Sequence, residues 1–259
     1  MNDAEYLARA GRRLARRYRP GSGPTIVFLP GYMSDMEGGK ASALAGWAEA
    51  QGRAMLRFDY AGCGLSEGAF EAQTLAGWRD DVLAMLDSVE GRLILVGSSM
   101  GGWLMLLAAL ARPERVAALV GIAAAPDFTD WGFDAAQKEI LRKHGRLEEP
   151  SPYGDAPYVT TRDFWESGEG LKLLGGEIAI RCPVRLLHGL DDADVPWQVS
   201  LRLIERLRSA DARMTLVKGG DHRLSRASDI ALLIETVETC CSADKDAGHY
   251  VDDEAGRNR

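Results

Sequence analysis

The stretch of sequence that decides the fold reads Leu93-Ile94-Leu95-Val96-Gly97-Ser98-Ser99-Met100-Gly101-Gly102-Trp103-Leu104-Met105-Leu106-Leu107. Its first four residues are typical of a buried β-strand, and its last five are typical of a helix. Between them lies the pattern G-x-S-x-G, which marks a tight strand–turn–helix bend that carries a nucleophilic serine. The glycines are required because the bend leaves no room for side chains two residues before and after Ser99. We therefore expect a strained Ser99 at a helix N-terminus, where developing negative charge is favoured.

Short apolar runs alternate with helix-like segments on both sides of this stretch. The expected strands cover residues 25–29, 54–58, 93–96, 116–122, 184–188 and 214–217, and the expected helices cover 42–51, 74–88, 100–111, 198–209 and 227–240. Apolar strands separated by helices predict an α/β fold, with a mostly parallel central sheet and helices on both of its faces. Residues 6–19 fit a hairpin that turns at Gly11, although their arginines also recur at helical spacing.

One interval, from Asp127 to Ile180, interrupts this alternation and is rich in aromatic residues. It lies between two expected core strands, so we expect it to be a lid inserted into a single α/β domain that spans residues 1–241. The alternative is that its aromatic side chains simply pack as core. The polar segment 242–259 shows no apolar periodicity and is predicted to be disordered.

Charge and hydropathy exclude several classes of protein. The 259 residues include 31 Lys and Arg against 38 Asp and Glu, a net charge of −7. This balance argues against a nucleic-acid partner, which usually leaves a basic footprint. No apolar run approaches the roughly 20 residues that a membrane span needs. The composition indicates a globular enzyme-sized domain, and it does not predict the oligomeric state.

The cysteines and the first residues bear on the compartment. Cys63, Cys182, Cys240 and Cys241 form no CxxC or metal-ligand spacing, so no metal or other cofactor is expected. The first five residues carry acidic groups and no apolar core of a signal peptide. Reduced thiols without a signal predict a cytoplasmic location. The arginines between residues 9 and 19 fit an organelle leader as the alternative.

A serine nucleophile needs a base, which is usually an oriented histidine. His222 follows the last expected strand directly, so it lies at the carboxyl edge of the sheet where Ser99 emerges. His249 lies in the polar tail, His144 lies in the inserted interval, and His188 ends a strand as a packed residue. We therefore expect His222 to be the base.

The acid that orients this histidine is expected in the loop after the preceding strand, because the order along the chain is serine, acid, histidine. That loop holds Asp191, Asp192 and Asp194. Spacing does not choose among the three, and Asp194 also fits the cap of the next helix. Asp221, next to His222, is more typical of a loop hydrogen bond.

The oxyanion that forms during acyl transfer needs two backbone N–H donors. Met100, directly after the serine, is expected to supply one of them. Tyr32 is expected to supply the other, because Gly31 lets the chain turn toward the site after the strand 25–29. Four tryptophans, at the floor and in the inserted interval, are expected to line an apolar substrate pocket: Trp103, Trp131, Trp165 and Trp197.

Four blocks together resemble the α/β-hydrolase superfamily. They are the serine turn, Pro30-Gly31-Tyr32, the D-x-x-G-x-G-x-S loop at residues 59–66, and His188-Gly189-Leu190-Asp191-Asp192-Ala193-Asp194-Val195-Pro196. In that superfamily the pattern H-G-x-x-D-x-x-V-P places the acid at its fifth residue, so the resemblance implies Asp192.

A narrower similarity, carried by residues 97–106, 185–197 and 221–223, is to the acyl-protein thioesterase and acyl-glucuronide esterase subfamily (abhydrolase member ten). It extends over roughly residues 25–238 and weakens in the inserted interval. The resemblance implies an α/β-hydrolase fold and an acyl-serine mechanism. Because no organelle leader is evident, we do not carry over the subfamily's mitochondrial setting.

The expected function is that of a serine hydrolase that cleaves the ester or thioester bond of a small-molecule or acylated-protein substrate. In it Asp192 orients His222, and His222 activates Ser99. The rival hypotheses are a serine peptidase of the same fold and a non-catalytic binding module. Acidic residues in the inserted interval are compatible with a peptidase subsite, namely Asp127, Asp130, Glu148 and Glu149.

Overall fold

The central element of the fold is a mixed sheet, described here from a computed structural model that covers residues 4–150 and 157–255, with side chains through residue 242. Within these residues the sheet has eight strands in the order β1-β2-β4-β3-β5-β6-β9-β10. Their bounds are Glu5–Arg9 (β1), Arg12–Arg19 (β2), Ser22–Leu29 (β3), Arg53–Phe58 (β4), Leu93–Ser98 (β5), Val116–Ile122 (β6), Val184–Gly189 (β9) and Ala212–Val217 (β10). All neighbours from β4 to β10 are parallel, whereas β2 is antiparallel to both β1 and β4.

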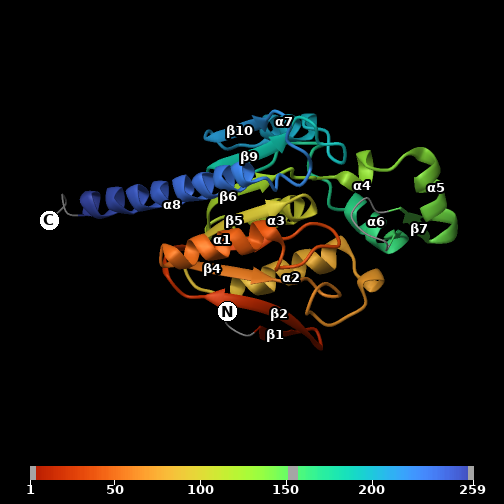
Figure 1. The fold of residues 1–259 in the computed structure, drawn as a ribbon, viewed down its shortest axis with the longest axis horizontal. Helices are drawn as coiled ribbons and strands as arrows, with labels where there is room; N and C mark the ends of the chain where they lie inside the picture. Colours follow the sequence, from red (N-terminus) through yellow and green to blue (C-terminus); the bar gives the residue numbers. More distant parts are fainter. Residues whose placement is uncertain (1–3, 151–156, 256–259) are drawn as a thin grey trace.

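Helices cover both faces of this sheet, as Figure 1 shows. On one face lie α1 (Gly39–Ala50) and α8 (Ala227–Ala255), and on the other lie α2 (Leu75–Asp87) and α3 (Met100–Ala111). The helix α7 (Gln198–Arg206) packs beside β10. Every residue of β5 and β6 is buried, which is why these strands read as continuous apolar runs. The predicted α/β class, with a mostly parallel sheet between helical layers, is confirmed.

The arginine-rich segment near the N-terminus forms the hairpin β1–β2, so the helical alternative is wrong. Its register pairs Arg9 with Arg12 at the turn and Glu5 with Arg16 at the open end. The arginine side chains reach acidic partners on neighbouring elements: Arg13 pairs with Glu67 at 2.7 Å and Arg17 with Glu37 at 2.6 Å. Arginines that pair with such partners explain a dense basic cluster in an acidic protein.

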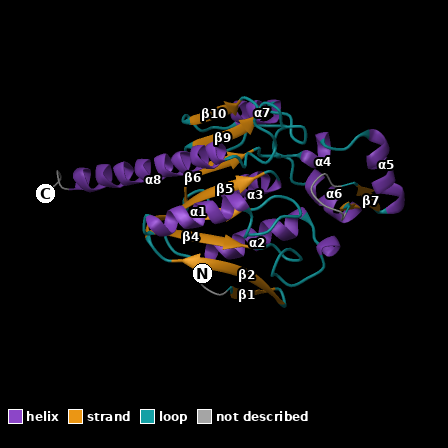
Figure 2. Cartoon of the chain, viewed as in Figure 1, coloured by secondary structure: helices purple, strands orange, loops and turns teal. Residues whose placement is uncertain are grey.

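The inserted interval, residues 127–180, is called the cap from here on. It contains α4 (Phe128–Trp131), α5 (Ala135–His144), α6 (Arg162–Glu169) and the two-stranded hairpin of β7 (Arg146–Glu149) and β8 (Tyr158–Thr161). Outside the cap, a short 3-10 turn, η1 (Phe70–Ala72), precedes α2. Figure 2 shows the arrows of the parallel strands pointing toward the cap, which therefore stands at the carboxyl edge of the sheet.

Asp127 ties the two ends of the cap together. Its buried carboxylate accepts hydrogen bonds from the backbone N–H groups of Leu173 and Leu174, both at 2.8 Å. Its backbone is left-handed, with φ of 58°. Burial raises the pKa of the Asp127 carboxyl above its ordinary value, and the two N–H donors oppose that shift. The first residue of the cap is thereby joined to the segment near the end of the cap.

The C-terminal helix α8 runs past the edge of the sheet in Figure 1. The predicted disorder from residue 242 stays a prediction, because residues 256–259 lie outside the described part and no side chain after 242 is described. None of the helices in the described part of the chain combines the length and the apolar character needed to cross a membrane.

Candidate active site

The turn between β5 and α3 holds Ser99 in a conformation that few residues adopt, with φ of 54° and ψ of −121°. Close backbone contacts force this shape. A Cβ atom on Gly101 would lie 2.1 Å from the Leu29 carbonyl oxygen, and one on Gly97 would lie 2.5 Å from the Gly101 oxygen. The Ser99 N–H donates to the Ile122 carbonyl at 2.9 Å. The glycines of the G-x-S-x-G pattern are thus required by contact, and the strain is held by the surrounding strands.

Loops after two adjacent strands bring the other predicted residues to Ser99. His222 follows β10, and its Nε2 lies 3.1 Å from the Ser99 Oγ. The Nδ1 of the same ring lies 2.9 Å from Oδ2 of Asp192, which follows β9. Both distances are hydrogen-bond distances. The three side chains therefore form one continuous chain of hydrogen bonds at the carboxyl edge.

The other aspartates near this chain have separate partners or positions. The Asp221 Oδ1 accepts from the Leu224 N–H at 2.9 Å, a loop hydrogen bond as expected from its position. Asp191 is exposed, and its N–H donates to the Gly220 carbonyl at 2.9 Å. Asp194 is exposed and lines the pocket, with its N–H directed at Asp192 Oδ1 at 3.0 Å. Of the three candidates left open by spacing, Asp192 is the one whose carboxylate lies at hydrogen-bond distance from the Nδ1 of His222.

The Asp192 carboxylate is buried but has many donors. Its Oδ1 accepts from the N–H groups of Asp194 and Val195, and its Oδ2 lies within 3.1 Å of both His188 and His222. Burial by itself raises the pKa of Asp192, but the hydrogen bonds from the two histidines and Val195 outweigh it and hold the pKa well below the usual range. An ionised Asp192 at neutral pH is the acceptor that an imidazole N–H needs.

The turn after β3 lies against the serine. A Cβ on Gly31 would lie 3.4 Å from the Cβ of Ser99. The residue that follows, Tyr32, therefore leaves the turn close to the nucleophile. The buried Tyr60 hydroxyl donates to the Pro30 carbonyl at 3.0 Å and fixes this turn. Met100 is the first residue of α3, where a backbone N–H has no acceptor within the helix. The structure thus places the turn before Tyr32 and the start of α3 beside Ser99, and the role of Tyr32 and Met100 as backbone donors stays a prediction.

A cavity of about 650 Å³ opens beside Ser99 and His222. This volume lies in the range of small-molecule sites. The aromatic part of its lining comes largely from the cap and comprises Phe28, Tyr32, Phe128, Trp131, Phe133 and Tyr158. The charged part of the lining comprises Asp35, Lys40, Glu149, Asp194 and Arg223. The cavity beside Ser99 therefore offers both apolar surface and charged groups.

Three of the four tryptophans predicted to line the pocket do not do so. Trp103 is fully buried in the core and donates to the Leu171 carbonyl at 3.3 Å. Trp165 is buried in a small core of the cap and donates to the Thr129 carbonyl at 3.0 Å. Trp197, directly before α7, is half-buried and lies outside the lining. Trp131 alone among them faces the cavity, because the others pack against neighbouring elements instead.

Sequence reasoning missed two features of this site. The side chain of Tyr32 packs among cap aromatics, with Phe164 at 5.2 Å between ring centroids, and its hydroxyl donates to the Val159 carbonyl at 2.6 Å. Burial raises the pKa of that hydroxyl far above its ordinary value. Lys40 donates to the Arg223 carbonyl at 2.5 Å, and burial lowers the pKa of its ammonium to about 8. No spacing in the sequence signals either contact, since each joins distant segments.

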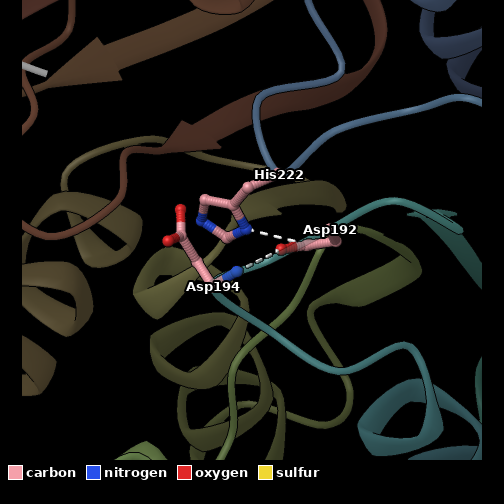
Figure 3. A group of neighbouring side chains, drawn as sticks. All are labelled: Asp192, Asp194 and His222. Atoms are coloured by element: carbon pink, nitrogen blue, oxygen red, sulfur yellow. Dashed lines mark hydrogen bonds and ion pairs between the residues drawn. The ribbon is translucent and has the colours of Figure 1, made fainter. Parts of the chain in front are cut away.

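One group of side chains in the described residues has the spacing of metal ligands: Asp192, Asp194 and His222, whose ligand atoms lie within 4.8 Å of one another. Figure 3 shows the His222 ring between the two carboxyl groups, with the Asp192 contact drawn. Asp192 Oδ1 accepts from two backbone N–H groups and its Oδ2 faces both His188 and His222, so these four contacts occupy the lone pairs that an ion would need. The arrangement suits a histidine that exchanges a proton with Ser99 better than it suits a metal.

Known proteins with similar sequences and structures have the same type of fold. The family described as "Serine aminopeptidase, S33" matches residues 23–149. A solved structure, alpha/beta hydrolase domain-containing protein 10 from mouse, superposes with a TM-score of 0.86 at 41% identity and covers 92% of this chain and 98% of that one. The fold is therefore that of an α/β hydrolase.

Two relatives identify a narrower family within the α/β hydrolases. The mitochondrial palmitoyl-protein thioesterase ABHD10 of mouse (Mus musculus) is 47% identical over 87% of this chain and 77% of its own length. The human (Homo sapiens) protein of the same name is 42% identical over 87% of this chain and 75% of its own length. The chain belongs to this ABHD10 family of α/β hydrolases, and it is a hydrolytic enzyme that cleaves ester or thioester bonds.

The predicted cytoplasmic location is contradicted by these relatives, which are both named as mitochondrial. The prediction rests on reduced thiols and on first residues without signal-peptide character, and neither observation identifies a compartment. None of the four cysteines, all in the described residues, forms a disulfide, and reduced thiols argue only against oxidising compartments. The arginines that fitted a leader are residues of β1 and β2.

Proposed function

We propose that this enzyme hydrolyses acyl thioesters and esters through an acyl-serine intermediate. His222, oriented by Asp192, takes the proton of the Ser99 hydroxyl as the oxygen attacks the acyl carbonyl. The N–H groups of Tyr32 and Met100 stabilise the oxyanion. His222 then gives the proton to the leaving thiol or alcohol, and in the second half it activates the water that releases the acid. The hydrogen-bond chain from Asp192 through His222 to Ser99 is the observation that carries this proposal.

The cavity supports an acyl chain as the part of the substrate that is held. Its aromatic lining offers apolar surface, and burial of each methylene there is worth about 0.8 kcal/mol. The charged lining residues are available to the leaving group. The relatives are named palmitoyl-protein thioesterases, so a long acyl chain on a protein cysteine is the substrate we propose first.

A peptidase is the second candidate, because the matching family is described as serine aminopeptidase. An aminopeptidase subsite needs a free carboxylate near Ser99 for the ammonium of its substrate. Asp127 binds two backbone N–H groups, Asp130 pairs with Lys172 at 3.6 Å, and Glu148 pairs with Arg146 at 2.7 Å. Glu149 does line the cavity, but it accepts from Gln137 at 2.7 Å. The acidic residues of the cap therefore favour the esterase.

The test of the mechanism is Ser99→Ala in folded protein. We expect kcat/KM for a short-chain nitrophenyl ester to fall by roughly 10³-fold or more, because the nucleophile is lost while the backbone donors remain. Labelling by a fluorophosphonate probe should disappear in the same variant. Ser98→Ala, next to it in the turn, is the matched control and should still be labelled. Activity of Ser99→Ala within tenfold of the parent, or no labelling of the parent enzyme, would overturn the mechanism.

The test of the substrate class is a panel of acyl thioesters, acyl esters, acyl glucuronides and aminoacyl substrates with matched chains. We expect kcat/KM to rise several-fold with each carbon added until the cavity is full. A higher kcat/KM for aminoacyl substrates than for every acyl substrate would favour the peptidase instead.

A further inference from the structure

His188, the last side chain of β9 before its terminal glycine, lies directly behind the Asp192 carboxylate. It is completely buried, and its Nε2 lies 3.1 Å from Asp192 Oδ2 and 2.9 Å from the Val195 carbonyl oxygen. Its Nδ1 lies 2.7 Å from the hydroxyl of Ser200, which is itself 1% exposed. The same Oδ2 lies 2.9 Å from His222. One carboxylate oxygen therefore sits between two imidazole rings.

The acceptors around His188 decide where its hydrogen lies. A backbone carbonyl oxygen only accepts, and an ionised carboxylate only accepts, so Nε2 must carry the hydrogen that points at Val195 and Asp192. With Nε2 as donor, Nδ1 accepts from the Ser200 hydroxyl. The ring is thus held in one tautomer and one orientation by α7 on one side and by the loop after β9 on the other.

We propose that His188 and Ser200 are positioning residues that act on the reaction through Asp192. The inference rests on the proposed acyl-serine mechanism and extends it by two residues, from Ser99 through His222, Asp192 and His188 to Ser200. His188 holds the carboxylate so that Oδ2 faces the Nδ1–H of His222. It also shares the negative charge of that oxygen, so His222 meets a less basic partner.

The groups that face Asp192 come from each neighbouring element. They are His188 from β9, His222 from the loop after β10, and the N–H groups of Asp194 and Val195 from its own loop. The Asp194 carboxyl lies beside the His222 ring (Figure 3). Removing the donor of His188 leaves Oδ2 with one hydrogen bond, which makes Asp192 hold the protonated His222 more strongly. The acid limb of the pH profile of kcat/KM then moves to higher pH.

The experiment compares His188→Leu, which removes both ring nitrogens, with His188→Gln, whose amide N–H₂ can replace the Nε2 donor. We expect His188→Leu to lower kcat/KM by roughly 10- to 100-fold. Its acid limb should move to higher pH by about 0.5 unit, because a hydrogen bond to a charged group is worth about one pKa unit and only part of it is transmitted. His188→Gln should recover most of both losses, and Ser200→Ala should give a smaller change of the same sign. His144→Gln, an exposed histidine in α5, is the matched control.

A second comparison keeps the proposal falsifiable if His188→Leu does not fold. In an Asp192→Asn background, His188→Gln and Ser200→Ala should change kcat/KM less than twofold, since both act through the carboxylate. Folded His188→Leu with parental kcat/KM and an unmoved acid limb would overturn the proposal. So would equal losses with and without Asp192, which are what a merely structural role predicts. Failure of the mechanism itself is distinguishable, because Ser99→Ala would then retain activity.

Discussion

The turn that carries Ser99 and the cap that stands above it are held by different kinds of contact. The turn is held by backbone groups at close approach: Gly101 against the Leu29 carbonyl, and the Ser99 N–H on Ile122. The cap is held by side chains, with its own small core of Phe133, Leu141, Leu147 and Trp165 and the Asp127 anchor at its base.

This difference teaches where the enzyme tolerates change. Backbone contacts leave no side chain to exchange, so the turn accepts almost no substitution. Side-chain packing in the cap allows the aromatic lining of the cavity to vary while the sheet and the hydrogen-bond chain stay in place. We therefore expect changes at the carboxyl edge to remove activity and changes in the cap to alter substrate preference or local stability.

The largest expected effect is that of Asp192→Asn. The amide places a donor or a weaker acceptor beside the Nδ1–H of His222, so we expect kcat/KM to fall by about 10⁴-fold, as for the corresponding change in a serine protease. Steady-state kinetics on a short-chain ester measures it, with circular dichroism to verify folding. The neighbouring Asp191→Asn should keep most activity. A dead Asp191→Asn beside an active Asp192→Asn would show that the acid is misassigned.

Gly101→Ala should break the turn itself. Its Cβ would lie 2.1 Å from the Leu29 oxygen and 2.5 Å from the Pro30 oxygen, so the backbone must shift, at a cost of about 3 kcal/mol or more in the free energy of unfolding. Urea denaturation measures this. The matched control is Gly175→Ala in the cap, where an added Cβ meets nothing within 4 Å. Equal stability of the two variants would contradict the contrast between turn and cap.

Substitution of two tryptophans of the cap should distinguish a residue that lines the cavity from one that packs in the core of the cap. Trp165→Ala should lower the free energy of unfolding by roughly 3 kcal/mol while the profile of kcat/KM against acyl-chain length keeps its shape. Trp131→Ala should flatten that profile with a smaller loss of stability, because Trp131 faces the cavity. Thermal melts and the chain-length panel read out both effects. An unchanged profile in Trp131→Ala would show that the cap aromatics do not hold substrate.

The smallest expected effect is on the pH dependence of stability. The folded-state pKa of Asp192 lies below the ordinary value of 3.8, so its contribution is present above about pH 4 and is lost as the pH falls toward the folded-state pKa. Asp192→Asn lacks this contribution. The difference in the free energy of unfolding between the two proteins should therefore shrink as the pH falls from about 5. Urea titrations at several pH values test this, and a difference that grows in acid would contradict it.

Much of this molecule could be predicted from local sequence. The geometry of the stretch around Ser99 can be predicted from its own residues, because a buried strand, two required glycines and a helix are compatible with only one kind of bend. The order of apolar runs predicted the layered α/β fold, and the position of His222 after the last strand placed it at the edge where Ser99 emerges. These features follow from neighbours in the chain or from the rule that parallel strands end at one edge.

The tertiary structure alone decided the features that join distant segments. Spacing left Asp191, Asp192 and Asp194 open, and the contact with His222 distinguishes them only in three dimensions. The sequence does not distinguish tryptophans that line the cavity from tryptophans that pack in the core. In the structure Trp131 faces the cavity, whereas Trp103 and Trp165 are buried in core clusters. His188 read as a packed strand end, and only the fold brings its ring against Asp192. Local sequence specifies backbone shape, whereas the direction and partner of a side chain depend on what the rest of the chain packs beside it.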